Sequence, residues 1–199
     1  MREKRLRAIG RAFGLGLCLV AAASCSSVMR ESRASSYLII DELGASNGAK
    51  PGEFGSVLQS DVQTNGSIYE DLGKMTCRLA IKDPTLSVGL TQMNFITITQ
   101  YHVEFIRSDG RNTQGVDVPY AFDGAVTGTV DNTTPRAIVF VLVRAQAKNE
   151  APLRALRGMG GSMLISTIAR VTFYGHDQAG NGVSVTGQIS VNFADWADV

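Results

Sequence analysis

The segment at residues 182–193 shows a strict alternation of apolar and polar positions. After Gly182, apolar residues and one glycine occupy the odd positions, and Ser, Thr, Gln and Asn occupy the even ones. This period of two predicts a β-strand with one buried face. The residues predicted to point inward include Val185, Ile189 and Val191, and those predicted to point outward include Thr186, Gln188 and Ser190.

A second alternating segment precedes the first at residues 162–175. Its apolar face is predicted to carry Met163, Ile165, Ala169, Val171 and Phe173. The turn-forming residues DQAGNG separate the two segments. The sequence therefore predicts a β-hairpin.

Three further segments also have the pattern of strands. Alternation in MTCRLAIKD places Cys77 on a buried face. In residues 94–108 the apolar phase shifts by one position, which predicts a β-bulge near Thr99 or Gln100. Residues 137–143 (AIVFVLV) are apolar on both faces, which favours a central strand. Pro119 lacks an N–H and is expected on an edge strand or at a bend.

One short helix is predicted near residues 150–157. Asn149 can cap it, Pro152 fits its first turn, and Leu153 and Leu156 share one face. Residues 44–73 are rich in Gly, Ser and Asn, so loops are expected there, with room for one short strand or turn of helix and with Val57, Leu58 and Val62 as core anchors. Seven or eight strands with turns between them predict an all-β fold, an antiparallel β-sandwich.

The closing segment VTFYGHDQAGNGVSVTGQISVNF resembles the last hairpin of bacterial immunoglobulin-like domains, in which an Asp-x-Ala-Gly-Asn turn is common. The resemblance covers about the last twenty-five residues. It implies an immunoglobulin-like sandwich and no particular activity.

The N-terminal region has a different pattern. Basic residues are followed by an apolar run and then by LVAAASC at residues 19–25, which resembles the lipobox of bacterial lipoproteins. The resemblance implies removal of residues 1–24 as a signal peptide and a diacylglyceryl group on Cys25. Residues 25–35 would then be a lipidated tether and residues 36–199 one domain. Ser26 follows the cysteine, which by resemblance to enterobacterial sorting favours the periplasmic face of the outer membrane. Two alternatives remain, namely cleavage after Ala23 to release a soluble protein and an uncleaved anchor.

Charge and cysteine content narrow the possible functions. The first 24 residues hold five of the 19 basic and one of the 18 acidic residues, so the remainder has a net charge near −3. Without a basic run, nucleic-acid binding is not expected. Cys18 lies in the removed segment and Cys25 is the lipid site, so Cys77 remains alone and no internal disulfide is predicted.

The sequence contains no catalytic or cofactor motif that we recognise. G-x-S-x-G, H-E-x-x-H, a phosphate loop and C-x-x-C do not occur, and GMGGSM at residues 158–163 is interpreted as a flexible turn. His102 is predicted on a solvated sheet face. We therefore predict no enzymatic activity, cofactor or metal ion.

Polar residues in the predicted turns are the remaining candidates for binding. Asp131 and Asp177 are expected at the same end of the sandwich, and Asp109 joins them if the chain reverses near residues 123–124. Clustered carboxylates could hold calcium, although Asp and Asn also favour turns for local hydrogen bonding. The candidate binding residues are Asp109, Asp131, Asn132, His176, Asp177 and Asn181.

These observations predict a membrane-anchored envelope lipoprotein that acts as a binding or structural module through loops at one end of a β-sandwich. Its partner would be an envelope protein or a glycan. Two alternatives are an enzyme that acts on envelope glycans with loop carboxylates and a carrier with an internal apolar pocket.

Overall fold

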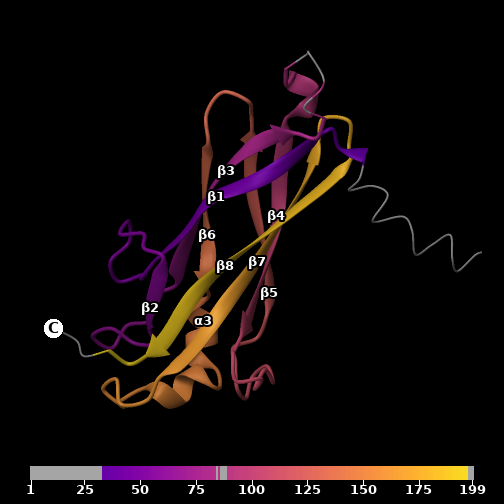
Figure 1. Ribbon diagram of the computed structural model, residues 1–199. Coiled ribbons are helices and arrows are strands. Elements are labelled where there is room, and N and C mark those ends of the chain that lie inside the picture. Colours follow the sequence, from indigo (N-terminus) through magenta and orange to yellow (C-terminus); the bar gives the residue numbers. More distant parts are fainter. Residues whose placement is uncertain (1–32, 84, 86–88, 197–199) are drawn as a thin grey trace, which may run out of the picture.

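The computed structural model describes residues 33–83, 85 and 89–196, and these form a two-layer β-sandwich (Figure 1). One sheet contains β1 (Ser36–Ser46), β3 (Asp71–Ile81) and β6 (Arg136–Val143), in that order. The other has the order β2 (Val57–Asp61), β8 (Gly182–Ala194), β7 (Ile165–Asp177), β4 (Ile96–Ile106) and β5 (Phe122–Val130). Neighbouring strands are antiparallel except for β2, which pairs with β8 in parallel. The predicted all-β sandwich is confirmed.

The sandwich has two ends, which we name after the two ends of β1. At the Ser36 end, β3 and β5 finish, β4 and β6 begin, and β7 turns into β8. At the Ser46 end, β3 and β5 begin and β4, β6 and β8 finish. The loops at residues 47–56, 62–70, 107–121 and 144–164 all lie at the Ser46 end (Figure 1).

The predicted hairpin is present as β7 and β8, with Tyr174 opposite Ser184 and Ile165 opposite Phe193. Ile189 and Val191 are buried and Val185 is partly buried, whereas the intervening polar residues are exposed. The predicted orientation of this strand is therefore confirmed. The bulge is confirmed as well, because the pairing of β4 with both neighbours shifts between Ile98 and Gln100.

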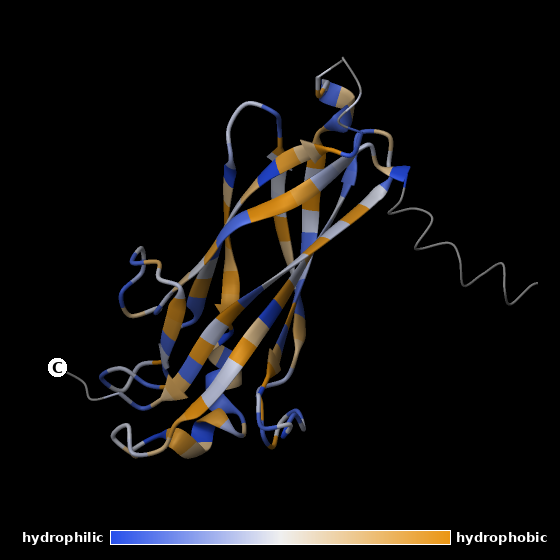
Figure 2. Ribbon diagram, viewed as in Figure 1, coloured by the Kyte–Doolittle hydropathy of each residue, from blue (hydrophilic) through white to orange (hydrophobic). Residues whose placement is uncertain are grey.

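The space between the sheets is filled by apolar side chains, several of them aromatic. Figure 2 shows that hydrophobic positions recur along the strands of both sheets. The rings of Phe140 and Phe173 lie 5.0 Å apart and nearly perpendicular, and Tyr101 lies 5.1 Å from Phe140. Such edge-to-face pairs are favourable beyond the area that they bury. A Cβ at Gly73 would lie 2.3 Å from the Phe140 ring, so a glycine is needed where β3 crosses this cluster.

Several details differ from the sequence predictions. Met163 lies before β7 and is 50% exposed, because the strand begins only at Ile165. Val57 is 46% exposed on an edge strand, whereas Leu58 and Val62 are buried as predicted. The segment AIVFVLV forms most of β6, which lies at the edge of its sheet and not in the centre. Val139 on the outward face of β6 is half exposed. The prediction that both faces of this strand are buried is therefore wrong.

The predicted helix consists of two short pieces, α3 (Ala145–Asn149) and the 3₁₀ turn η2 (Leu153–Leu156). Asn149 ends α3 and does not cap the following turn, because its side-chain amide donates to the carbonyl oxygen of Ala145. Leu153 and Leu156 are buried together, as their spacing predicts. A further 3₁₀ turn, η1 (Gln92–Asn94), precedes β4.

The predicted signal peptide and Cys25 lie outside the described residues, as does most of the tether. Among the residues that the structure describes, no helix has the length and apolar character needed to cross a bilayer.

Candidate functional site at the Ser46 end

Two of the predicted binding aspartates lie at the Ser36 end, on either side of β4. Ile96 begins β4 and pairs with Val130 on β5 and with Asp177 on β7. Asp131 directly follows Val130, so the backbones at Asp131 and Asp177 are separated by about two strand spacings, roughly 10 Å. The predicted proximity of these two residues is therefore present.

Both carboxylate oxygens of Asp177 and one oxygen of Asp131 accept hydrogen bonds inside their own turns. Asp177 is buried, and it accepts hydrogen bonds from the backbone of Ala179 at 2.9 Å and from the backbone and side chain of Asn181, each at 2.8 Å. Asp131 accepts from the hydroxyl of Thr133 at 2.6 Å and from its N–H at 2.8 Å, which hold the pKa of Asp131 below its usual range. Both aspartates thus stabilise turns.

The remaining predicted residues do not complete a site with these two. The Asn132 amide donates to the carbonyl oxygen of Leu90, and His176 is exposed. Asp109 lies at the Ser46 end, because residues 123–124 continue along β5 without the chain reversal that would have brought it over. There the side chains of Arg107 and Arg111 donate to Asp109 and hold its pKa well below the usual range.

The described part of the chain contains no group of three or more His, Cys, Asp or Glu side chains arranged to hold a metal ion. A calcium ion between Asp131 and Asp177 would have to displace the N–H groups that donate to Asp177 and would compete with the Thr133 donors at Oδ1 of Asp131. The geometry therefore does not support the calcium alternative.

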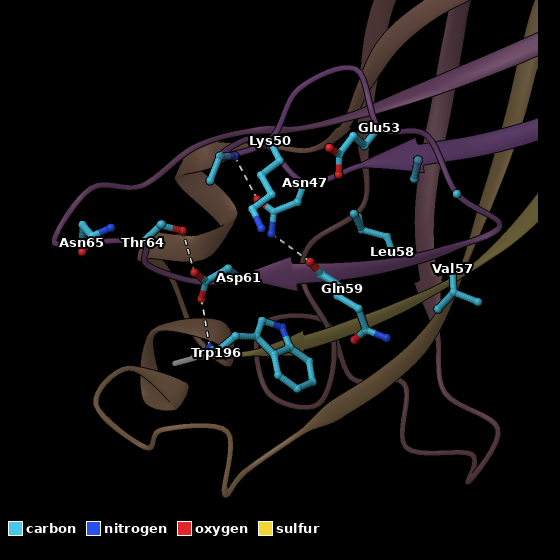
Figure 3. A pocket seen from close by; sticks show the side chains of 13 residues that line it. Asn47, Lys50, Glu53, Val57, Leu58, Gln59, Asp61, Thr64, Asn65 and Trp196 are labelled. Atoms are coloured by element: carbon cyan, nitrogen blue, oxygen red, sulfur yellow. Dashed lines mark hydrogen bonds between the residues drawn. The ribbon is translucent and has the colours of Figure 1, made fainter. Parts of the chain in front are cut away.

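A different set of residues forms an open pocket of about 460 Å³ at the Ser46 end, along the edge strand β2 (Figure 3). This volume is within the range of small-molecule sites. In the view of Figure 3, Lys50, Asn47 and Glu53 lie above β2 and Trp196 lies below it. We call it the β2 pocket. Its polar and aromatic lining residues are Asn47, Lys50, Glu53, Gln59, Asp61, Thr64, Asn65 and Trp196.

A buried ion pair holds the elements around this pocket together. The Lys148 ammonium on α3 lies 2.9 Å from Oδ1 of Asp71 at the start of β3, and the two side chains are 1% and 0% exposed. The hydroxyl of Ser60 on β2 donates to Oδ2 of Asp71 at 2.6 Å, and the N–H of Gly48 donates to Oδ1 at 2.9 Å. Burial raises the pKa of Asp71, and the ammonium and the other donors oppose this effect. The network connects β2, β3, α3 and the loop at residues 47–56.

The loop above β2 is held by close contacts. A Cβ at Gly48 would lie 2.0 Å from the carbonyl oxygen of Glu70, so only glycine fits there. The Asn47 side chain donates to the carbonyl oxygen of Gln59 at 2.9 Å and accepts from the N–H of Ala49. The upper wall of the β2 pocket is therefore fixed to the strand that forms its floor.

Trp196 is positioned by Asp61, which ends β2. One carboxylate oxygen of Asp61 accepts from the N–H of Trp196 at 3.1 Å, and the other accepts from the Thr64 hydroxyl at 2.5 Å (Figure 3). The indole nitrogen of Trp196 is buried and has no hydrogen-bond partner. A buried N–H without an acceptor is costly.

Sequence reasoning missed this pocket. Its upper wall and floor fall within residues 44–73, where we expected loops with at most one short strand or turn of helix. The one sequence feature that could have drawn attention to the pocket is the single tryptophan, Trp196. It is far in sequence from residues 44–73, so the sequence does not show that the two lie together. The pairing of β2 with β8, which brings Trp196 to Asp61, cannot be inferred from periodicity.

Comparison with known proteins gives little further information. The sequence matches no protein-family model and no curated protein. One similar solved structure is the X-ray structure of Northeast Structural Genomics Consortium target SoR45, with 12% sequence identity and a TM-score of 0.33. The match covers 80% of this chain and 86% of that one.

Proposed function

We propose that the protein is a lipid-anchored component of the bacterial cell envelope that binds a partner at the Ser46 end of its sandwich. The observation that carries this proposal is the position of the β2 pocket relative to the start of the folded domain. β1 begins at Ser36 and runs for 11 residues to Ser46, a length of roughly 36 Å. A tether from Cys25 would lead to the Ser36 end, and the β2 pocket lies at the other.

This arrangement suits a module that is held at one end and binds at the other. The loops at the Ser46 end are long, and loops on a rigid sandwich commonly present binding groups. They also expose apolar side chains, including Met159, Met163 and Leu164. The proposed contact surface is therefore opposite to the turns of Asp131 and Asp177, which would face the membrane.

The anchor is tested by Cys25→Ala, with Cys77→Ala as the matched control. The Cys25 variant is expected to leave the membrane fraction and to lose labelling by a fatty-acid analogue, because one diacylglyceryl group supplies the two chains needed for stable attachment. The control is expected to stay membrane-bound. Unchanged fractionation of Cys25→Ala would overturn the anchor.

The contact surface is tested by photo-crosslinking in cells. A photoreactive residue in place of Asn65 lies at the β2 pocket, and one in place of Gln178 lies in the exposed turn at the Ser36 end. Specific adducts are expected from position 65. Adducts from position 178 alone would contradict binding at the Ser46 end.

The two alternatives have less support. A glycan-acting enzyme needs two carboxylates that face each other across a cleft, whereas Asp131 and Asp177 are engaged in their own turns. A carrier needs a hollow interior, and the space around Phe140 and Phe173 is filled.

A further inference from the structure

We propose that the β2 pocket binds a neutral saccharide, such as one or two units of an envelope glycan. This inference rests on the proposed binding function and names the chemical class of its ligand. Three properties of the pocket lead to it. Its charges nearly cancel, it has a single aromatic side chain, and the free edge of β2 is already hydrogen-bonded by Asn47.

The charged groups of the pocket nearly cancel. Lys50 opposes Glu53, and the carboxylate of Asp61 is engaged by the Thr64 hydroxyl and the Trp196 backbone. Without a cluster of like charge, nothing in the pocket selects a strongly charged ligand such as a phosphate. Among the other polar lining groups, the Asn47 amide and the Thr64 hydroxyl already make hydrogen bonds within the chain. Gln59 is exposed, and its side-chain amide can both donate and accept. A polyhydroxyl ligand, whose groups also donate and accept, is the best match.

The aromatic component comes from Trp196. A tryptophan ring offers a large rigid apolar surface together with an N–H donor. A sugar ring has the same combination, because its C–H groups form apolar faces and its hydroxyls lie around the rim. Trp196 is only partly buried, so part of this side chain is available at the pocket wall.

An extended peptide is the competing ligand, because β2 is an edge strand and edge strands can accept an additional strand. The Asn47 side chain, however, already donates to the carbonyl oxygen of Gln59 in the middle of β2. The Asn47 loop thus occupies the side from which a peptide would pair. A ligand that is recognised through side chains is favoured over one that is recognised through the backbone.

The sole tryptophan of the chain provides a direct measurement, because it lines the pocket. The full lipid-modified protein in detergent would be titrated with chitotetraose and with maltotetraose, and tetraalanine and inorganic phosphate would serve as comparison probes. We expect a saturable change in tryptophan fluorescence with at least one saccharide at millimolar concentration or below. Neither comparison probe should produce it.

Two glutamines on neighbouring strands give a matched pair of variants. Gln59 lines the pocket, and Gln188 is exposed on β8 away from it. Gln59→Ala is expected to weaken saccharide binding about fivefold, the typical effect of one lost hydrogen bond, while Gln188→Ala leaves it unchanged. Glu53→Gln gives a second pocket variant should Gln59→Ala fail to fold, and circular dichroism checks the fold of each.

The proposal is overturned if no saccharide alters the fluorescence at millimolar concentration, or if the two glutamine variants bind saccharide equally. A response to tetraalanine alone would assign the pocket to peptides, and the proposed binding function would then survive without its saccharide ligand. Crosslinking from position 65 separates the two failures, because it reports a partner of any chemistry.

Discussion

The side chains of Lys148 and Asp71 form an ion pair with an N–O distance of 2.9 Å, and water reaches almost none of either group. This pair joins α3 to the first residue of β3. Two buried charges are expensive to remove from water, and the cost is met only when each keeps its partner and further hydrogen bonds. Ser60 and Gly48 supply such bonds to Asp71, so the wall of the β2 pocket depends on this pair.

Removal of one partner should therefore be costly. Lys148→Met leaves Asp71 buried without its counter-charge and is expected to lower the free energy of unfolding by about 3–5 kcal/mol, measured by urea denaturation. Arg78→Met is the control, because it breaks the exposed pair of Arg78 with Asp41 and should cost less than about 1 kcal/mol. Equal effects of the two variants would contradict the structural role of the buried pair.

Cys77 should make stability depend on alkaline pH. Burial raises the pKa of its thiol from 9.0 to about 11. Between these values the unfolded chain releases the proton and the folded chain keeps it, so folding is progressively disfavoured as pH rises from 9 to 11, by up to roughly 2–3 kcal/mol. Urea denaturation across this range would measure the loss. Cys77→Ala should show a shallower decline, and identical pH profiles would exclude the effect.

The burial of β8 can be tested with two adjacent positions. Val191 is fully buried, and its neighbour Ser190 is exposed on the opposite face. Val191→Asp would place an unpaired charge between the sheets and is expected to destabilise the fold by several kcal/mol. Ser190→Asp should have an effect within about 0.5 kcal/mol. Thermal unfolding followed by circular dichroism would distinguish the variants, and similar melting temperatures would show that the register is wrong.

The turn aspartates should affect stability more than binding. Asp177→Ala removes a buried carboxylate that accepts from two backbone N–H groups of its turn and is expected to cost about 1–3 kcal/mol. Asp131→Ala, in a more exposed turn, should cost less. Both variants should bind saccharide normally in the fluorescence titration. If either variant bound saccharide more weakly, the contact surface would have to lie at the Ser36 end.

The sequence predicted the features of the fold that depend on one strand alone. Alternation along β7 and β8 reveals which side chains are buried, and the phase shift in β4 reveals its bulge, because each effect is local to one strand. The apolar run of β6 was less informative. An edge strand covered on one face can be as apolar as a central strand, and Val139 shows that the outer face is exposed.

The candidate site could not be predicted, because contacts between distant segments create it. Gly48, Ser60, Asp71 and Lys148 belong to four different segments, and nothing in the sequence around any one of them indicates the others. Asp131 and Asp177 were easier to place at one end, since strand direction alone determines that. Whether their oxygens are free or engaged depends on the conformation of each turn, which periodicity does not reveal.

The parallel pairing of β2 with β8 also sets an order of events during biosynthesis. β2 emerges early from the ribosome, but within the described residues it pairs with β8 alone. Leu58 therefore cannot meet Val191 until nearly all of the described chain has been made. Contacts between such distant segments form late. A product interrupted before β8 would lack both this partner and Trp196. Binding in the β2 pocket would thus distinguish finished molecules from incomplete ones.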